Sequence, residues 1–598
     1  MDAFRVHQRL INDYRAFTEG FVDVRDDRIR ARVEGESISG AQWPDPWLSL
    51  NPSFEAGGTV DELVADGTLH PTCARVFRAK NRMDDPGSEP LNLYRHQSDA
   101  VRIARTGASY VLTTGTGSGK SLAYIVPIVD RVLREGSGKG VRAIVVYPMN
   151  ALANSQVEEL EKFLSFGFDG NPPVTFKRYT GQESSDERAA ILADPPDILL
   201  TNYVMLDLVL TRPDERSSLV QAANGLRFLV LDELHTYRGR QGADVAMLVR
   251  RVREACHAEE TLQCVGTSAT MSSRGTLAEQ QEDVAEVSSR IFGTTIQPKN
   301  VITETIVRAT TRREPSVEAL VAAVKSRGIA EIGDVVEDLG FAGLQSDPLA
   351  SWIEDAFGVT SEHGSGRLIR QQPTTVQKAG ADLAALTGSD SSSAETAIRA
   401  TFLAGSRSAN PMTRRPLFAF RLHQFLSKGG SVYVTLEPED SREITTEFQL
   451  VLPGDSADRR LYPLAFCREC GQEYLAVHRG ESSDSRVFLS RHQLRPASPD
   501  DGYLFISADH EWPADPVTEG RLPASWTNDS GVIAASRKKN VPIRYAATSD
   551  GLASPHGPGA APDGSTIAAW IPGAFRFCLR CGVSYEAPRA NEFSKLVT

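Results

Sequence analysis

The pattern of apolar and polar positions changes along the chain, and each change predicts a different kind of structure. Near the amino terminus, Phe4, Leu10, Ile11, Tyr14 and Phe17 recur at helical spacing among charged residues, which predicts an amphipathic helix. The stretch WPDPWLSLNPSFEAGG that follows predicts loops, and VDELVADGTLHP predicts a short helix that ends near its glycine and proline. We interpret residues 1–90 as an entry module that packs on the domain after it.

Residues 91–273 alternate short apolar runs with longer helical patterns. Continuous apolar runs are typical of strands that are buried on both faces. Strands that alternate with helices predict a parallel α/β sheet with helices on both faces. The runs are YVLTT, RAIVVYP, DILLTNY, RFLVLDE and CVGTSAT.

The remaining chain divides into a helical and a β-rich part. In residues 274–415, the patterns SVEALVAAVKS, LASWIEDAF and AGADLAALTG predict a helical insertion, interrupted by GSDSSSAE. In residues 416–598, SVYVTLE, TEFQLVLP and RVFLS predict strands, and the composition of 482–573 predicts long loops and partial disorder. The segment FAFRLHQFL has a helix-like apolar pattern, so we expect its His423 to be a core or interface residue rather than a ligand.

Composition then narrows the class of protein. With 598 residues, 41% of them hydrophobic and 24% charged, the chain can bury several cores, which excludes wholesale disorder. The 77 acidic residues exceed the 65 basic ones, and the net charge of −12 argues against a uniformly basic coat while permitting a local basic groove. Seven cysteines are too few for a disulfide scaffold, which favours a reducing compartment. Because no apolar run is long enough for a membrane helix or a signal peptide, we expect a cytoplasmic protein without a membrane partner.

The segment VLTTGTGSGKS, residues 111–121, predicts a phosphate-binding loop. An apolar run leads into a glycine-rich turn and then a helix, the order in which backbone amides and a helix N-terminus cradle phosphates. Lys120 would reach the outer phosphates of ATP, and the Ser121 hydroxyl would bind Mg²⁺. Thr114 stands where the usual pattern has its first glycine. The expected nucleotide-binding residues here are Thr114, Gly115, Thr116, Gly117, Ser118, Gly119, Lys120 and Ser121.

The segment RFLVLDELH predicts the acidic partner of this loop. Its strand delivers Asp232 and Glu233 at the carboxyl end, which is where parallel sheets place their ligands. Asp232 would hold Mg²⁺, and Glu233 would orient and deprotonate the attacking water. We therefore expect Lys120, Asp232 and Glu233 to be the catalytic residues.

These segments together resemble the first motor lobe of superfamily 2 helicases of the DEAD/DEAH type, a RecA-like domain that binds ATP and Mg²⁺. LYRHQ is similar to the Q motif, in which Gln97 would read adenine. TGTGSGKS is similar to motif I, and DELH, with His235, to motif II. Motif III, which couples hydrolysis to movement, corresponds to Ser268, Ala269 and Thr270.

Three further segments resemble the motifs with which these helicases track a nucleic-acid strand. YPMNALANSQ, YTG and LLTNY occur in the family's order. Neutral side chains and backbone amides in such loops can hold phosphates without reading bases, so they do not separate DNA from RNA. The expected nucleic-acid residues are Pro148, Asn150, Ala151, Thr180, Gly181, Thr201 and Asn202.

A narrower resemblance follows motif II. DELHTYRGRQGADVAMLVRRV, through Arg238, Gly239 and Gly242, is similar to the large bacterial helicases associated with the DUF1998 region, as is LNPSFEAGGTVDELV. This resemblance implies an ATP-dependent DNA helicase or translocase in DNA repair or phage defence, with members generally moving 3′ to 5′.

Two cysteine pairs share the pattern F-C-x-x-C-G-x-x-Y, in FCRECGQEY and FCLRCGVSY. Two such knuckles can supply four thiolates for a structural zinc site, namely Cys467, Cys470, Cys578 and Cys581. The 107 residues between the pairs (578 − 470 − 1) exceed the usual zinc-ribbon loop, and a redox dithiol is an alternative for either pair. We interpret Cys73, Cys256 and Cys264 as ordinary buried thiols.

No segment after residue 273 resembles the arginine-rich motif VI of a second RecA-like lobe. We expect that lobe to be absent from these residues and to be supplied in cis by a longer protein or in trans by a subunit. Two alternatives remain open: an ATP-binding nucleic-acid adaptor without turnover of its own, and an RNA helicase.

Overall fold

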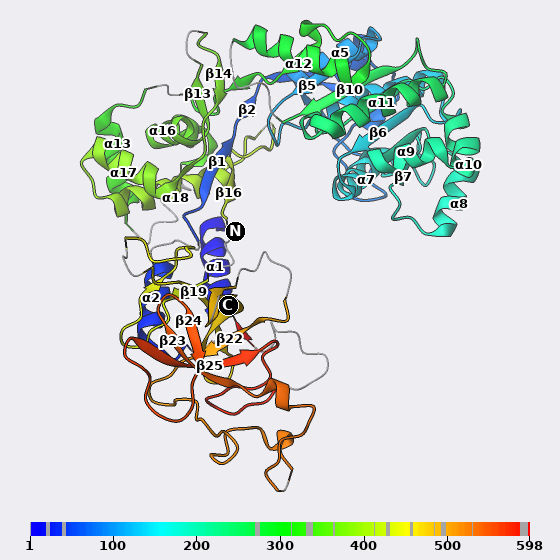
Figure 1. The fold of residues 1–598 in the computed structure, drawn as a ribbon. Coiled ribbons are helices and arrows are strands. Elements are labelled where there is room, and N and C mark those ends of the chain that lie inside the picture. The colour runs from blue at the N-terminus through cyan, green and yellow to red at the C-terminus, as the bar shows by residue number, and fades with distance from the viewer. Residues whose placement is uncertain are drawn as a thin grey trace. The chain divides into compact units, whose positions relative to one another are not determined.

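The computed structural model describes two compact units, which we call the α/β unit and the β unit (Figure 1). The α/β unit is Leu48–Arg421, and the β unit combines Met1–Trp47 with Leu422–Thr598. The described residues are 2–19, 24–38, 43–269, 276–311, 314–329, 339–362, 365–411, 413–425, 431–454, 458–482, 485–491, 498–528, 530–585 and 596–597.

A seven-stranded parallel sheet forms the centre of the α/β unit, in the order β11-β5-β10-β9-β6-β8-β7. Every residue of β5, β6, β9 and β10 is buried, because helices cover both faces. All five predicted strand segments are present, which confirms the predicted α/β class. The strands are β5 (Tyr110–Thr113), β6 (Ala143–Tyr147), β7 (Phe176–Tyr179), β8 (Ile198–Asn202), β9 (Phe228–Leu231), β10 (Gln263–Ser268) and β11 (Val301–Thr303).

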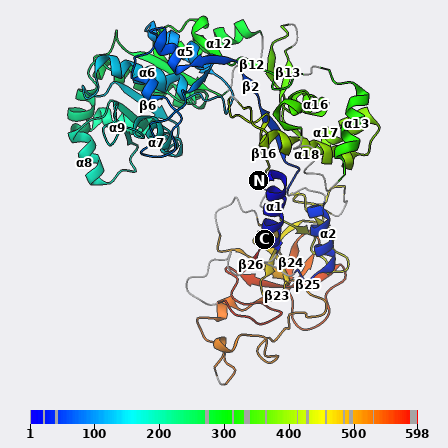
Figure 2. The ribbon, with the colours of Figure 1, turned by 180° about the vertical axis from the view of Figure 1, so that it is seen from behind.

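Two apolar clusters, one on each face, hold the covering helices to the sheet. Figures 1 and 2 show the sheet and these helices as ribbons from two sides. One face carries α3 (Val60–Ala65), α4 (Cys73–Val76), α5 (Arg95–Arg105), α6 (Leu122–Glu135) and α7 (Asn150–Leu164). The other carries α8 (Ser185–Ala193), α9 (Tyr203–Thr211), α11 (Gly239–Ala255) and α12 (Leu277–Phe292). The short helix α10 (Pro213–Glu215) follows α9. Because β11 pairs with β5, this sheet extends beyond residue 273, where the sequence placed the end of the lobe.

The predicted helical insertion forms α13 (Val317–Arg327), α15 (Gly340–Gln345), α16 (Pro348–Phe357), α17 (Val376–Thr387) and α18 (Ser391–Arg407). Arg327 and Asp347 form a buried two-pronged ion pair within it, with Nη1–Oδ1 at 2.9 Å and Nη2–Oδ2 at 2.5 Å. Small sheets accompany the helices: β15-β1-β16, β12-β2, β13-β14 and β3-β4. Their strands are β1 (Trp47–Asn51), β2 (Ser53–Phe54), β3 (Ala56–Thr59), β4 (Asn92–Tyr94), β12 (Ile306–Val307), β13 (Val359–Ser361), β14 (Leu368–Arg370), β15 (Thr374–Thr375) and β16 (Ala419–His423).

The helical interpretation of FAFRLHQFL is wrong. This segment contains strand β16, whose residues alternate between exposed and half-buried. Phe418, Phe420 and Leu422 recur at every second position, which is the period of a strand. His423 is exposed at the end of β16 rather than buried in a core.

The β unit begins with the predicted amphipathic helix α1 (Ala3–Glu19) and with α2 (Asp27–Ile38). Its ten-stranded sheet contains a closed ring, because β20, β21, β24, β23, β25 and β22 each pair with the next and β22 returns to β20. Four of these strands lie between residues 500 and 573, where the sequence predicted long loops. The strands are β17 (Tyr433–Val434), β18 (Ile444–Thr445), β19 (Tyr462–Cys467), β20 (Glu473–Ser482), β21 (Ser485–Ser490), β22 (Asp501–Phe505), β23 (Ile543–Thr548), β24 (Leu552–Pro555), β25 (Ser565–Pro572) and β26 (Leu596–Val597).

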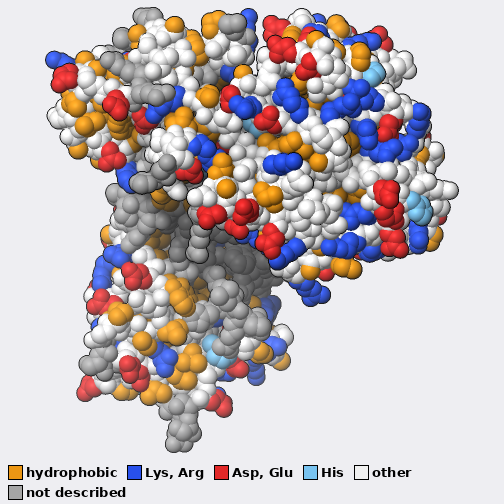
Figure 3. Space-filling model, turned by 90° about the horizontal axis from the view of Figure 1, so that it is seen from above, with side chains coloured by type: hydrophobic (Ala, Val, Ile, Leu, Met, Phe, Trp, Pro, Cys, Tyr) orange, Lys and Arg blue, Asp and Glu red, His pale blue; other side chains and the backbone are white. Residues whose placement is uncertain are grey.

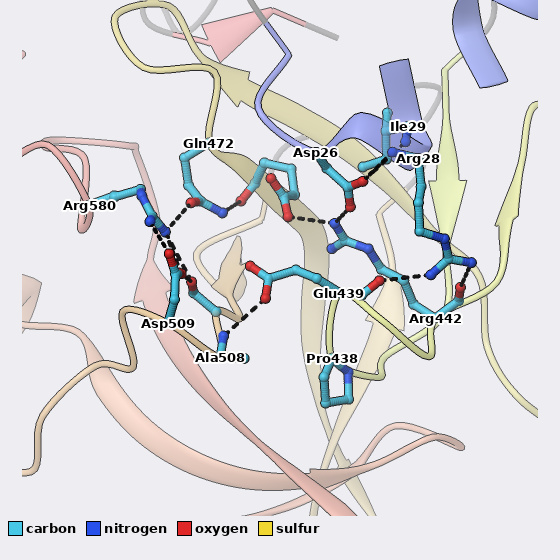
Figure 4. A network of polar contacts seen from close by, with 12 residues as sticks. Asp26, Arg28, Ile29, Pro438, Glu439, Arg442, Gln472, Ala508, Asp509 and Arg580 are labelled. Atoms are coloured by element: carbon cyan, nitrogen blue, oxygen red, sulfur yellow. Dashed lines mark hydrogen bonds and ion pairs between the residues drawn. The ribbon is translucent and has the colours of Figure 1, made fainter. Parts of the chain in front are cut away.

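A buried arginine ties the start of α2 to this sheet (Figure 4). Arg442 donates to the carboxylate of Asp26 and, at 2.6 Å, to that of Glu473. The network continues to the second cysteine knuckle, since Gln472 accepts a hydrogen bond from Arg580 at 3.3 Å and Arg580 also pairs with Asp509.

The surface agrees with the acidic composition. The face drawn in Figure 3 carries Lys and Arg side chains interspersed with Asp and Glu, and no continuous basic coat. Among the described residues, no helix has both the length and the apolar character needed to span a bilayer.

Candidate nucleotide site, strand groove and cysteine cluster

The glycine-rich loop runs from the end of β5 to the start of α6. Gly117 and Gly119 have φ values of 82° and 70°, which favour glycine, and a Cβ on Gly119 would lie 2.6 Å from the amide nitrogen of Gln97. The side chain of Thr114 stabilises the loop, because its Oγ1 forms a hydrogen bond of 2.6 Å with Ser118 Oγ. The loop therefore keeps its amides close to any phosphate that it holds.

Gln97 lies against this loop at the start of α5. Its Nε2 donates to the carbonyl of Gly119 at 2.8 Å, and its Oε1 accepts the backbone N–H of Tyr94 at 2.8 Å. The amide thus fixes the loop to the segment before α5. Its predicted contact with adenine stays a prediction.

The acidic pair follows β9 and faces the lysine of the loop. Lys120 Nζ lies 2.9 Å from Glu233 Oε1, and Glu233 adopts a left-handed φ of 50°. Burial raises the pKa of Asp232 above its ordinary value of 3.8, and a hydrogen bond from the Thr267 hydroxyl only partly offsets this effect. Thr267 also accepts the backbone N–H of Glu233 at 3.1 Å. Thr267 was not among the residues expected from the sequence, although it directly precedes the motif III segment.

His235 connects the acidic pair to motif III. Its Nδ1 lies 3.3 Å from Glu233 Oε2 and 3.3 Å from Ser268 Oγ, and the N–H of Ala269 approaches it at 3.4 Å. A single imidazole therefore touches both segments that the sequence expected to be coupled. Thr270, the last residue of this predicted set, lies outside the described residues.

The predicted strand-tracking residues meet in a groove of about 540 Å³ beside the carboxyl ends of β6, β7 and β8. Asn202 organises it, since its Nδ2 donates to Asn150 Oδ1 at 2.8 Å and to the Thr180 carbonyl at 3.1 Å. Of the predicted set, Pro148, Asn150, Thr180, Gly181 and Asn202 line the groove.

Two predicted residues lie outside this lining, and two arginines that were not predicted lie within it. Ala151 is exposed at the start of α7. Thr201 is fully buried and donates its hydroxyl to the Tyr179 carbonyl at 2.7 Å, so its side chain supports the groove from inside. Arg188 and Arg212 add positive charge to the lining. Single arginines outside the recognised motifs gave no sequence signal for such a role.

The two cysteine pairs come together in the β unit. The sulfur atoms of Cys467, Cys470, Cys578 and Cys581 all lie within 4.8 Å of one another. Cys467 and Cys581 are 3.9 Å apart, and Cys470 and Cys578 are 3.7 Å apart, far beyond the ~2.05 Å of a disulfide bond. A tetrahedral zinc with Zn–S bonds of ~2.3 Å separates its ligands by ~3.8 Å, so this donor set fits zinc. The other three cysteines are buried, as expected.

The tyrosine of each knuckle reaches across to the other knuckle. Tyr474 places its hydroxyl 3.1 Å from Cys578 Sγ, and Tyr585 places its hydroxyl 3.3 Å from Cys467 Sγ. The glycine after each pair, Gly471 and Gly582, has a positive φ, which gives both knuckles the same tight turn. The long separation in sequence has a simple cause: the ring of strands from β20 to β25 lies between the pairs and returns the chain to the first knuckle.

Part of the α/β unit matches a known protein family. A family model described as DEAD/DEAH box helicase matches residues 94–277. Druantia protein DruE of Escherichia coli is 23% identical over 84% of this chain, and the uncharacterized ATP-dependent helicase YprA of Bacillus subtilis is 32% identical over 31%. This chain spans 34% of DruE and 24% of YprA. A solved structure of the DUF1998 helicase MrfA bound to DNA is 24% identical, with a TM-score of 0.33 over 43% of this chain and 30% of that one. The chain therefore contains a DEAD/DEAH box helicase domain, to which residues 94–277 are matched.

Proposed function

We propose that this chain is the ATP-hydrolysing portion of a DNA helicase or translocase that serves DNA repair or anti-phage defence. One observation carries the proposal: a single sheet edge gathers the phosphate loop, the acidic pair and the groove organised by Asn202. Proximity along one rigid sheet lets a change at the nucleotide bias the strand groove. The similarity to DruE, which extends well beyond residues 94–277, supports a relationship over most of the chain.

The residues at this edge divide the work of hydrolysis. Lys120 would neutralise charge on the outer phosphates, and Glu233 would orient the attacking water and accept its proton. Asp232 and the Ser121 hydroxyl would hold Mg²⁺, because hard oxygen donors are the ligands that this ion prefers. When bound, Mg²⁺ neutralises phosphate charge. His235 and Ser268 would relay the state of Glu233 to the strand groove.

Titration of the full chain with a fluorescent ATP analogue tests the nucleotide site. We expect Lys120→Ala to abolish binding, because the loop loses its only lysine and the charge that faces Glu233. Lys139→Ala, on the exposed turn after α6, is the matched control and leaves binding unchanged. Equal affinity of the wild type and Lys120→Ala would overturn the assignment.

Hydrolysis and movement are expected to require a second RecA-like lobe. An arginine finger contributes ~10³–10⁵ in rate, and translocation needs a second strand grip. Residues 1–598 alone should therefore show little DNA-stimulated turnover and no unwinding, and addition of the second lobe in cis or in trans should restore both. Strong DNA-stimulated hydrolysis by this chain alone, in a steady-state assay with single-stranded DNA, would contradict the requirement.

The groove supports a nucleic acid as the second ligand, and DNA is the choice that the DUF1998 resemblance favours. The main alternatives are an RNA helicase and an ATP-binding adaptor without turnover. Binding measured with matched single-stranded DNA and RNA distinguishes an RNA helicase from the proposed DNA helicase. A clear preference for RNA would replace the proposal. Persistent lack of turnover after addition of the second lobe would favour the adaptor.

We further propose that the cysteine cluster binds one structural zinc ion. The four thiolates fill a tetrahedral shell, which leaves no open position for water, so the metal would stabilise rather than catalyse. Elemental analysis of freshly purified, reduced protein should find about one zinc per chain, released by a thiol-modifying reagent. Protein without zinc under these conditions would count against the site.

A further inference from the structure

Two strands outside the parallel sheet place polar side chains on the phosphate loop. Strand β16 carries Arg421, whose Nη1 donates to Thr116 Oγ1 at 2.7 Å. Strand β1, which pairs beside β16, carries Asn51, whose Nδ2 donates to the Gly117 carbonyl at 3.3 Å. Arg421 lies 305 residues from Thr116 along the chain, and neither strand contributes to the phosphate loop, the acidic pair or motif III.

A second arginine reaches the same loop, but its charge is already neutralised. Glu304 accepts the backbone N–H of Gly115 at 2.9 Å, and Arg370 grips that carboxylate with Nε at 2.7 Å and Nη2 at 2.9 Å. Such two-pronged pairs are strong and satisfy both partners. Arg370 therefore has little capacity left for another anion.

Arg421 differs because the described part of the chain offers it no acidic partner. Among the described residues, no carboxylate lies within the 4.0 Å of an ion pair with it, and its side chain is exposed at the loop. A guanidinium carries five donors, and the contact with Thr116 uses one of them. An unneutralised arginine held against a phosphate-binding loop is suited to a phosphate oxygen, which it can bind with two parallel hydrogen bonds.

We propose that Arg421 binds the terminal phosphate of ATP from outside the motor lobe, with Asn51 holding the loop in place. Lys120 approaches the outer phosphates from the helix end of the loop, and Arg421 meets the loop at Thr116, nearer its strand end. The two cations would bracket the outer phosphates. The pairing of β1 with β16 would then make ATP binding sensitive to the position of the segment that follows the helical insertion.

This inference rests on the proposed ATP site, so the test must distinguish a failure of the Arg421 proposal from a failure of the ATP site itself. The full chain is titrated with fluorescent analogues of ATP and of ADP, as wild type, Arg421→Ala, Arg421→Lys, Arg414→Ala and Lys120→Ala. Arg414 is an exposed arginine seven positions earlier that makes no ion pair among the described residues, so it controls for loss of surface charge.

Arg421→Ala should lower the affinity for the ATP analogue by about tenfold or more, which is the usual cost of losing a hydrogen bond to a charged group. Its affinity for the ADP analogue should change by less than about threefold. The affinity of Arg421→Lys for the ATP analogue should lie between those of the wild type and Arg421→Ala. Lysine keeps the positive charge but cannot form two parallel hydrogen bonds to one phosphate. Arg414→Ala should bind both analogues with the affinity of the wild type. The unchanged ADP affinity also shows that the variant is folded.

Two results would overturn the inference alone: wild-type ATP affinity in Arg421→Ala while Lys120→Ala loses binding, or an equal loss of ATP and ADP. A wild type that binds neither nucleotide, or a Lys120→Ala variant that binds both normally, would overturn the proposed ATP site and this inference with it.

Discussion

Replacing Arg442 with methionine should destabilise the β unit by ~3–5 kcal/mol. The guanidinium is only 1% exposed and contacts two carboxylates, Asp26 and Glu473, of which the latter is 2% exposed. Methionine keeps most of the apolar stem but leaves both carboxylates buried without their cation. Removing one member of a buried ion pair costs this much because the remaining charge has lost its compensation.

The electrostatic origin of this cost can be separated from packing. The triple variant Arg442→Met, Asp26→Asn, Glu473→Gln removes all three charges and should recover most of the lost stability, since neutral groups are cheaper to bury.

The stability lost in Arg442→Met should also depend on pH. Burial raises the pKa of Asp26, but the hydrogen bond and charge of Arg442 outweigh burial and lower it below the ordinary 3.8.

A depressed pKa means that the Asp26 carboxylate stabilises the fold above pH ~4 and loses this contribution as the pH falls. In Arg442→Met, the unpaired Asp26 carboxylate instead takes up a proton more readily, and protonation relieves the cost of burying its charge. The difference in stability between the wild type and Arg442→Met should therefore narrow below pH ~4.

Urea unfolding followed by tryptophan fluorescence is the assay, on the full chain. Of six tryptophans, Trp43, Trp512, Trp526 and Trp570 are buried in the β unit, so the signal reports mainly on it. With a slope of ~2–3 kcal/mol per molar urea, the midpoint should fall by ~1–2.5 M. A midpoint within ~0.3 M of the wild type refutes the predicted destabilisation. A triple variant as unstable as Arg442→Met would show that packing, not charge, sets the cost.

Three further predictions concern the proposed sites. Glu233→Gln should keep wild-type affinity for an ATP analogue and block hydrolysis in the complete helicase, because the amide cannot accept the water's proton; measurable turnover would contradict this role. Tyr474→Phe should lower zinc affinity by ~10–100-fold in competition with a chelator, because Cys578 loses a hydrogen bond, and unchanged affinity would make that contact irrelevant. Arg188→Ala should weaken single-stranded DNA binding at low salt and reduce the slope of log affinity against log salt by about one; an unchanged slope would remove Arg188 from the strand groove.

The sequence by itself determined the elements whose chemistry depends on adjacent residues. The phosphate loop, the Asp232–Glu233 pair and the cysteine knuckles each need fixed residue types at short spacing, so they could be recognised without a structure. The buried strands could be recognised for the same reason, because an unbroken apolar run reflects burial on both faces. Where the local pattern was misread, as in the segment of β16, a two-residue period was present but was interpreted as helical.

Only the tertiary structure decided which distant residues meet. Asp26 and Arg442 are 416 residues apart, Tyr585 and Cys467 are 118 apart, and Arg421 and Thr116 are 305 apart. No local spacing encodes such contacts, because they depend on strand order: β16 beside β1, and a ring of strands that returns the second knuckle to the first. Thr267 illustrates the same limit, since its hydroxyl reaches Asp232 only because β10 pairs with β9. Side-chain periods specify which face of an element is buried, whereas the packing of whole elements specifies which charges and hydroxyls lie side by side.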